Sequence, residues 1–472
     1  MKSELADTAT PPTARAPGIR VPGSKPPGSK PPGSPPASRK AAGTAPARSR
    51  AAGGNQAVSD KPGGNRTAGL RQAEAERPFA CDVVIVGGCG RVGLPLGLAF
   101  ADRGLDVVLY DVNAAAVARV DSGRLPFDEA GAPEALARTL HRSLAATTHP
   151  ECIAEAEVVV VVIGTPVDEH LNPDPSAVPA AIGHLLDHLV DGQLIVLRST
   201  LYPGVTAAVE RLVAGSGKDI DVAYCPERIA EGKAMTELCL LPQIVAARSE
   251  QASDRASELF RSLTDEVVLL TPEEAELAKL FTNTWRYIRF AVANQLYVMA
   301  NEAGLDYERI RAALSHNYPR AADFPRAGLA AGPCLVKDTM QLAAFSGNNF
   351  GLGHAAMTVN EGLPLYLVRR MEEQFDLARM TVGVLGMAFK AESDDTRSSL
   401  SYKLKRLLRF KAAEVLITDP YVTTDPNLVP LDEVLERADV VVIGTPHRAY
   451  AALTLRQPVI DVWDLFGGGV LV

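Results

Sequence analysis

The feature that most constrains the fold is a glycine-rich turn between a buried apolar strand and an apolar helix. The expected strand covers residues 81–86, and the turn Gly88-Cys89-Gly90-Arg91-Val92-Gly93 comes shortly after it. A second apolar run, 107–110, leads into Asp111, which lies 18 residues after Gly93. This order of strand, GxGxxG turn, helix, strand and acid is typical of a βαβ unit that binds a dinucleotide.

The same unit predicts which residues meet the dinucleotide. Glycines allow the backbone to approach a pyrophosphate, and the acid bonds the adenosine ribose. Because the negative charge of Asp111 would repel a 2′-phosphate, the expected cofactor is NAD and not NADP. The expected contacts are Gly88, Gly90, Arg91, Val92, Gly93 and Asp111. The alternative is a tight strand-to-helix turn without a ligand.

Polar side chains follow three further expected strands. Thr165 follows the run 158–163, and Arg198-Ser199-Thr200 follows the run 194–197. Cys225-Pro226-Glu227-Arg228 follows the run 222–224. In an open parallel sheet, ligands bind outside the carboxyl ends of the strands. We therefore expect Thr165, Thr200 and Glu227 to contact a ligand, whereas the alternative is ordinary strand-end capping and turn chemistry.

A long helix is predicted from Thr271 to Ala303. Thr271-Pro272-Glu273-Glu274 combines an N-cap, a proline at the first helical position and an acid three residues after the cap. About 32 helical residues give a rod of roughly 48 Å, long enough to connect two domains. Lys279 and Asn283 lie on one face of this helix, where they either point at a ligand or are simply solvated.

The C-terminal part repeats the alternation of strands and helices. Strands are expected at 381–386 and 414–419 and near 440–444, with a helix at 398–410. This pattern predicts a second parallel α/β domain, which lacks a GxGxxG turn. Lys390 and Arg397 suit the binding of a diphosphate, and the alternative is a structural pair between Arg397 and its neighbouring aspartates.

One thiol, Cys334, precedes Lys337 and Asp338 in the stretch Ala331-Gly332-Pro333-Cys334-Leu335-Val336-Lys337-Asp338. A thiol is nucleophilic as the thiolate, and nearby cations lower its pKa. We therefore consider Cys334 a candidate nucleophile, with a buried loop cysteine as the alternative.

Composition and charge exclude several classes of protein. Residues 1–77 carry 13 Lys and Arg against 5 Asp and Glu, so the rest of the chain has a net charge of −16. An acidic body argues against nucleic-acid binding. The longest apolar run, 158–163, is far too short for a membrane helix. Six cysteines without CxxC spacing indicate neither a metal site nor a disulfide framework, and they fit a reducing cytoplasm.

Over residues 80–472 the chain resembles the UDP-glucose/GDP-mannose dehydrogenase family. The matching motifs are Gly88–Gly93, Gly164-Thr165-Pro166, Ser199-Thr200, Pro226-Glu227, Lys279 with Asn283, Cys334 with Lys337-Asp338, Phe389-Lys390 and Asp394-Asp395-Thr396-Arg397. The resemblance implies two Rossmann-like domains joined by a long helix that also builds a homodimer. It implies that Cys334 is the nucleophile and that Lys279, Asn283 and Asp338 are its companions. It further implies that Thr200 and Glu227 assist a water, and that Lys390 and Arg397 lie near UDP.

The chain departs from the family pattern in two places. Ala331-Gly332-Pro333 stands where many members have Gly-Gly-Ser or Gly-Gly-His, and Pro333 removes a backbone donor. The segment ending in Arg228 resembles the N-acetylhexosamine branch, whereas Lys337-Asp338-Thr339 resembles the UDP-glucose branch. Arg320, in Tyr318-Pro319-Arg320, resembles a substrate-contacting arginine of the former branch. Substrate contacts are therefore expected from Glu227, Arg228, Lys279, Asn283, Arg320, Lys337, Lys390 and Arg397.

The expected organisation is a disordered basic Pro/Gly-rich tail at 1–77, an NAD-binding Rossmann domain at 78–266, a central helical dimerisation and catalytic region at 267–375, and a UDP-sugar-binding Rossmann-like domain at 376–472. The expected activity is oxidation of the C6 hydroxymethyl of a UDP-sugar to the acid, with two hydride transfers to NAD and a thioester on Cys334. Two alternatives stay open. One is a two-electron hydroxyacid dehydrogenase, and the other is a catalytically silent sugar-nucleotide-binding protein.

Overall fold

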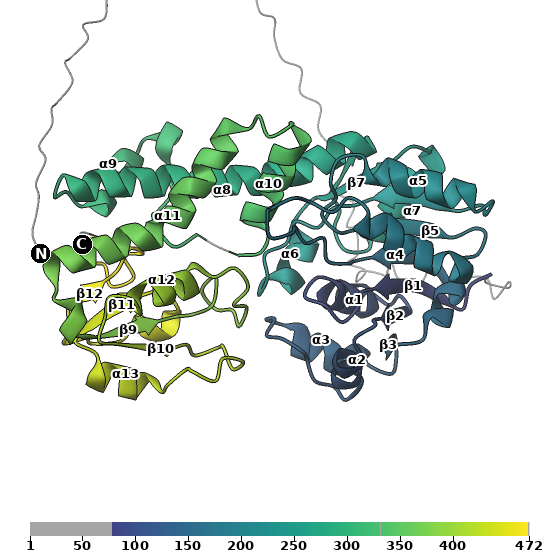
Figure 1. Ribbon diagram of the computed structural model, residues 1–472. Helices are drawn as coiled ribbons and strands as arrows, with labels where there is room; N and C mark the ends of the chain where they lie inside the picture. Colours follow the sequence, from purple (N-terminus) through teal and green to yellow (C-terminus); the bar gives the residue numbers. More distant parts are fainter. Residues whose placement is uncertain (1–77, 331, 471) are drawn as a thin grey trace, which may run out of the picture. The chain divides into compact units, whose positions relative to one another are not determined.

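The computed structural model of the protein describes residues 78–330, 332–470 and 472 (Figure 1). The expected basic tail at 1–77 lies outside these described residues. Within the described ranges, no helix combines the length and the apolar character needed to cross a bilayer.

The first half of the described chain forms an eight-stranded sheet in the order β3-β2-β1-β4-β5-β6-β7-β8. All neighbouring strands are parallel except β6 and β7, which pair antiparallel. The strands are β1 (Cys81–Val86), β2 (Val107–Tyr110), β3 (Leu144–Thr147), β4 (Ala156–Val161), β5 (Leu194–Leu197), β6 (Asp221–Tyr224), β7 (Gln243–Ala247) and β8 (Val267–Leu270).

Helices cover both faces of this sheet because alternate strand residues point to opposite faces. In β1, Val83 and Ile85 join one buried core, whereas Val84 and Val86 join the other. The first core includes side chains of α1 (Gly93–Asp102), α2 (Ala114–Asp121), α3 (Ala132–Thr139), α6 (Ala234–Leu240) and α7 (Glu250–Arg261). The second includes side chains of α4 (Ala177–Leu185), α5 (Val205–Gly215) and the start of α8 (Pro272–Glu302).

The long helix α8 begins and ends close to where the sequence predicts. Thr271 and Glu274 form a reciprocal capping box at its start, and Ala303 is its C-cap. Its first turns belong to the N-terminal domain. Glu276 is buried and accepts hydrogen bonds from the backbone N–H groups of Gly204 (2.6 Å) and Thr206 (2.8 Å) at the start of α5. Its last turns contribute Tyr297 and Ala300 to the core of the C-terminal domain.

Three more helices follow α8 and lead to the second sheet. They are α9 (Tyr307–Ser315), α10 (Leu335–Phe345) and α11 (Gly351–Gln374). The second sheet has the order β10-β9-β11-β12 and is parallel throughout. Its strands are β9 (Thr381–Leu385), β10 (Glu414–Thr418), β11 (Val440–Ile443) and β12 (Val459–Ile460), and its helices are α12 (Leu400–Leu408) and α13 (Leu431–Arg437). The prediction of two α/β domains joined by a long central helix is confirmed.

The structure differs from the sequence-based expectation in local details. Three strands of the first sheet, β3, β7 and β8, and β12 of the second are additional, and the antiparallel entry of β7 makes the first sheet mixed. Because β8 pairs with β7, the sheet extends to Leu270, beyond the expected domain boundary at 266. The segment before β4, Pro150–Glu155, forms a 3₁₀ helix.

Candidate functional site

The glycine-rich loop after β1 has the shape of a phosphate cradle. A Cβ on Gly88 would lie 2.7 Å from the Ile85 carbonyl oxygen, and one on Gly93 would lie 2.4 Å from the Gly87 carbonyl oxygen. These two glycines are therefore required by packing. Gly90 is exposed, and a Cβ there would meet only the Gly87 carbonyl oxygen, at 3.4 Å. Its open side leaves room for a ligand, at the N-terminus of α1, where an anion is favoured.

Asp111 is fixed beside this loop. Its carboxylate accepts hydrogen bonds from the Cys89 N–H at 3.0 Å and from the Asn113 N–H at 2.9 Å. The acid therefore stays at the carboxyl end of β2, next to the glycine turn, as a ribose-binding acid requires. Together with the open face of Gly90, this arrangement fits an NAD molecule.

The side chain of Arg91 extends from the glycine loop to the C-terminal domain. Its Nη1 lies 2.8 Å from Asp394 Oδ1, and its Nε lies 3.7 Å from Asp395 Oδ2. The guanidinium also stacks over the Phe127 ring, 5.0 Å from the centroid. Arg91 was expected to contact the cofactor; here its charge is engaged by two aspartates of the other domain.

The residues around Cys334 gather where α8 meets α10. Asn283 of α8 donates a hydrogen bond from Nδ2 to Asp338 Oδ2 at 2.5 Å. Asp338 is fully buried, and its other oxygen, Oδ1, lies 2.8 Å from Lys337 Nζ. This contact is an ion pair without hydrogen-bond geometry, so Oδ1 can still accept a hydrogen bond from another donor. A buried carboxylate oxygen in this state is suited to hold a water or to accept a proton.

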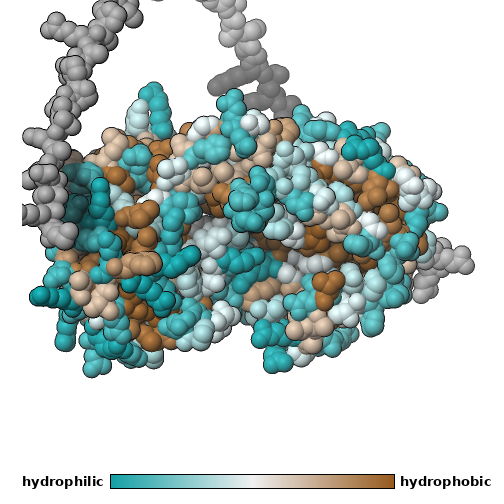
Figure 2. Space-filling view, in the orientation of Figure 1, coloured by the Kyte–Doolittle hydropathy of each residue, from teal (hydrophilic) through white to brown (hydrophobic). Residues whose placement is uncertain are grey.

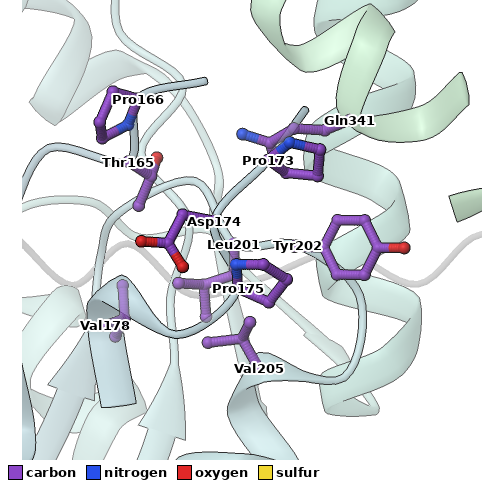
Figure 3. Close-up of a pocket in the computed structure, with 10 residues that line it drawn as sticks. All are labelled: Thr165, Pro166, Pro173, Asp174, Pro175, Val178, Leu201, Tyr202, Val205 and Gln341. Atoms are coloured by element: carbon purple, nitrogen blue, oxygen red, sulfur yellow. The ribbon is translucent and has the colours of Figure 1, made fainter. Parts of the chain in front are cut away.

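Lys337 connects this cluster to the strand ends of the first sheet. Its Nζ donates to Thr165 Oγ1 at 3.3 Å, and Thr165 Oγ1 in turn donates to the Thr200 carbonyl oxygen at 2.9 Å. Figure 3 shows Thr165 and Gln341 in the wall of a small adjoining pocket. Gln341 is buried, and its Oε1 has no hydrogen-bond partner among the described residues.

Lys279 is buried in the same cluster, on the face of α8 that also carries Asn283. Burial lowers the pKa of the Lys279 ammonium below its usual value, although the charges of Asp338, Cys334 and Glu227 act in the opposite direction. A lysine with a lowered pKa releases its proton more readily at neutral pH, as a base must.

The thiol of Cys334 behaves differently from the sequence-based expectation. The residue is exposed, but protein atoms surround its sulfur closely enough for desolvation to matter. Desolvation and the Asp338 carboxylate raise the pKa of the Cys334 thiol, and they outweigh Lys337 and Lys279, which lower it. The two lysines thus lower the pKa of the Cys334 thiol as expected, but the net shift is upward because desolvation and Asp338 have the larger effect.

Glu227 is held by a buried arginine that the sequence analysis did not nominate. Arg198 is fully buried, and its Nη2 lies 2.5 Å from Glu227 Oε2. Glu227 Oε1 accepts hydrogen bonds from the N–H groups of Arg228 at 2.6 Å and Ile229 at 2.9 Å. Both oxygens of this carboxylate are thus engaged. Arg198 follows β5 directly, so its position at a strand end was the available signal.

Lys390 and Arg397 both contact Glu231, an acid that was not predicted from the sequence. Lys390 Nζ donates to the Glu231 carbonyl oxygen. Arg397 Nη2 lies 3.2 Å from Glu231 Oε1 and 2.6 Å from Asp395 Oδ2. The structural pair considered as the alternative for Arg397 is therefore present. Burial, followed by the charge of Asp395, raises the pKa of Glu231 to about 7.

The loop before Cys334 packs against the C-terminal domain through a glycine. Gly332 has a φ of +109°, and a Cβ there would lie 2.6 Å from the Phe389 ring. The backbone conformation and the close approach of Phe389 both require glycine at this position.

Two expected substrate contacts are engaged elsewhere. Arg228 is half-buried and donates to the Pro242 carbonyl oxygen. Arg320 is exposed; its Nη1 donates to Tyr318 Oη at 3.0 Å, and its guanidinium stacks on the same ring. Its described hydrogen bonds do not join it to the cluster around Cys334.

Three domains of one protein family match this chain in succession. Residues 82–264, 273–362 and 383–466 match, respectively, the NAD binding, central and UDP binding domains of the UDP-glucose/GDP-mannose dehydrogenase family.

Individual relatives cover most of the described chain. The UDP-N-acetyl-D-mannosamine dehydrogenase of Pyrococcus horikoshii is 32% identical over 384 residues, which span 78% of this chain and 90% of that protein. A solved structure of a UDP-D-ManNAc dehydrogenase from Pyrococcus horikoshii has a TM-score of 0.75 at 29% identity and covers 80% of this chain and 94% of its own. The structure of a UDP-glucose dehydrogenase from Pyrobaculum islandicum has a TM-score of 0.75 at 29% identity, with coverages of 81% and 94%.

Proposed function

Because the chain belongs to the UDP-glucose/GDP-mannose dehydrogenase family, we propose that it oxidises the C6 hydroxymethyl of a UDP-sugar to the uronic acid in an NAD-dependent, four-electron reaction. The observation that carries the proposal is an exposed thiol, Cys334, surrounded by Lys279, Lys337 and Asp338. A nucleophilic thiol allows an aldehyde to be carried on to an acid, because its addition makes the trigonal carbon tetrahedral.

The first oxidation needs a group that accepts the alcohol proton. Lys279, with its lowered pKa, can take this proton directly or through a water held by Asp338 Oδ1. Asn283 orients Asp338 through its 2.5 Å hydrogen bond, so the carboxylate presents one fixed oxygen. When bound, NAD would supply the acceptor for the hydrides released from C6.

The second oxidation needs a tetrahedral carbon. The Cys334 sulfur adds to the aldehyde carbon, the carbonyl oxygen takes a proton, and a thiohemiacetal forms. Loss of its hydride and its hydroxyl proton gives a thioester. A water then adds to the acyl carbon, the carbon–sulfur bond breaks, and the thiolate is restored. Glu227, Asp338 or both activate this water; each carboxylate is paired with one cation, Glu227 with Arg198 and Asp338 with Lys337.

The division of the chain follows from the same proposal. Residues 78–266 would bind NAD, 267–375 would carry the catalytic side chains, and 376–472 would receive UDP through Lys390 and Arg397. The substrate is a UDP-N-acetylhexosamine or UDP-glucose, because the relatives described above are named for both kinds of sugar. A panel of UDP- and GDP-sugars assayed for NAD reduction identifies which is used.

The decisive experiment measures how many NADH molecules form per molecule of acid. We expect two NADH per acid formed, and we expect Cys334→Ser to abolish net acid formation. Cys239→Ser is the matched control, since Cys239 is a free thiol on α6 that accepts a hydrogen bond from Arg103. One NADH per product would select a two-electron hydroxyacid dehydrogenase. No NADH from any nucleotide sugar would select a silent sugar-nucleotide-binding protein.

We also propose a homodimer built through α8. Phe281, Trp285, Val292 and Met299 are 53%, 59%, 44% and 60% exposed and lie on one face of this helix. An exposed apolar stripe of this length favours burial against a partner. Light scattering after gel filtration should show a dimer that Trp285→Glu dissociates, whereas Leu314→Glu on α9 leaves it intact.

The compartment we propose is the cytoplasm. All six cysteines lie among the described residues as free thiols, which fits a reducing environment. Cell fractionation with an antibody against the protein tests this assignment.

A further inference from the structure

His447 is buried between the ends of two strands of the second sheet. It follows β11, and its side chain is fully buried. Its Nε2 lies 3.1 Å from Oδ2 of Asp419, the residue after β10. Its Nδ1 accepts a hydrogen bond from the Glu392 backbone N–H at 3.0 Å. Both ring nitrogens are therefore engaged, one by the sheet and one by the loop that follows β9.

These contacts fix the tautomer of the neutral ring. Because Nδ1 accepts a hydrogen bond from a backbone N–H, the proton of the neutral ring must sit on Nε2, which donates a hydrogen bond to Asp419. Asp419 is itself held by the N–H groups of Met387 (2.6 Å) and Ala388 (3.0 Å). Burial alone would raise the pKa of Asp419, but His447 and these N–H groups lower it to about 2. The acceptor for the ring proton is thus a carboxylate throughout the physiological range.

The residue that His447 anchors has a strained backbone. Glu392 has a φ of +56°, in the left-handed region that non-glycine residues rarely adopt. Its carboxylate is also restrained: it accepts hydrogen bonds from the Arg448 N–H and the Tyr421 hydroxyl, both at 2.8 Å. Such a conformation persists only where the surroundings over-determine it, and these strained positions cluster at ligand sites.

The strained residue lies within the segment that carries the proposed diphosphate ligands, which we name the 388–397 loop. The Ala388 carbonyl oxygen accepts hydrogen bonds from the hydroxyls of Thr445 and Ser399. The Phe389 N–H donates to the Asp395 carbonyl oxygen at 2.9 Å and closes the loop on itself. Lys390 precedes Glu392 by two residues, and Arg397 ends the loop.

We propose that His447 is a positioning residue that fixes the 388–397 loop, and with it Lys390 and Arg397, in the conformation that receives a nucleoside diphosphate. The inference rests on the proposed function, because it assigns UDP to this loop. His447 does not itself touch the diphosphate in this account. It acts through the Glu392 N–H, whose release would let the turn leave its left-handed conformation.

Two nearly isosteric variants separate the two ring contacts. In His447→Asn the side-chain oxygen can take the place of Nδ1 and accept the Glu392 N–H. In His447→Gln the side-chain amide can take the place of Nε2 and reach Asp419, but the acceptor for Glu392 is lost. Calorimetry with UDP as the probe should show a Kd about tenfold weaker for His447→Gln, the loss expected for one hydrogen bond, and a Kd within about threefold of wild type for His447→Asn. The Kd for NAD should be unchanged in both.

The outcomes distinguish the inference from the function on which it rests. Equal UDP affinities for wild type and both variants would overturn the positioning role alone. Wild-type protein that binds NAD but not UDP would overturn the proposed function and this inference with it. A second measurement needs no variant: the ¹⁵N shifts of histidine-labelled wild-type protein should show the Nε2–H tautomer at His447. A proton on Nδ1 would contradict the hydrogen bond from Glu392.

Discussion

Arg91 of the glycine-rich loop forms an ion pair with Asp394 of the 388–397 loop, with 2.8 Å between Nη1 and Oδ1. Each side chain is 22% exposed. The loop expected to hold a pyrophosphate and the loop expected to hold a UDP-sugar therefore touch through opposite charges. Hydrophilic and apolar residues are interspersed on the face of the molecule in Figure 2.

A double-mutant cycle measures this contact. We expect Arg91→Met and Asp394→Asn each to lower the stability of the protein, with a coupling of about 1 kcal/mol in urea unfolding, because both groups are largely shielded from water. The pair Arg138–Asp102 is the control: it is 2.9 Å long but 55% and 39% exposed, and its coupling should be smaller. Strictly additive effects of Arg91→Met and Asp394→Asn would show that the two loops are not coupled.

Gly332→Ala tests the packing of the loop before Cys334. The new Cβ would lie 2.6 Å from the Phe389 ring at a φ of +109°, so the loop must move. We expect kcat/KM to fall at least about tenfold, since a small displacement of a reacting group is costly. Gly347→Ala is the control, because Gly347 also has a positive φ (+64°) but open space around it. Equal losses in the two variants would point to backbone strain alone and not to Phe389.

Removing the negative charge of Asp338 should make the Cys334 thiol more reactive, because Asp338 and desolvation together raise its pKa more than the nearby lysines lower it. Because Asp338 contributes to the raised pKa of the Cys334 thiol, Asp338→Asn should lower that pKa and speed alkylation by iodoacetamide at pH 7.5 at least about threefold. Lys337→Gln should slow it. Site-resolved mass spectrometry follows Cys334, with buried Cys225 as an internal reference. Slower alkylation in Asp338→Asn would contradict this electrostatic account.

Glu231 should make the protein less stable as the pH rises. Its pKa is raised in the folded state to about 7, from the ordinary value of 4.5, chiefly by burial. Between these two values the native state keeps a proton that the unfolded state releases, so stability falls as pH increases from about 4.5 to about 7. Glu231→Gln should therefore gain in Tm relative to wild type between pH 5 and pH 8. Glu258→Gln, at an exposed acid of α7, should show no such trend.

Local patterns in the sequence predicted much of the fold. Each of these patterns involves residues close together in the sequence. The structure contains the capping box at Thr271, the glycine turn before α1 and the alternation of strands with helices. The strand β8 was missed because it is only four residues long, and an apolar run of that length does not by itself distinguish a strand from a helix. Its partner β7 enters antiparallel, an orientation that no local pattern specifies.

Part of the cluster around Cys334 could be predicted from the sequence, but its electrostatics could not. The spacing of Lys279 and Asn283 predicted that they share one helical face, and in the folded chain that face meets Asp338. The sign of the pKa shift at Cys334 was not predictable, because it depends on desolvation by residues distant in sequence. The contacts Arg91–Asp394 and Gly332–Phe389 likewise join the two domains, and only the folded chain brings them together.

The capping of α5 by Glu276 limits how the protein can be divided. A fragment that ended with β8 would contain the N-terminal sheet but would lack the carboxylate that satisfies the Gly204 and Thr206 N–H groups. The long helix is thus an integral part of the first domain and not a detachable connector. Exchanging cofactor domains between related dehydrogenases will succeed only if the recombination point lies downstream of the first turns of α8.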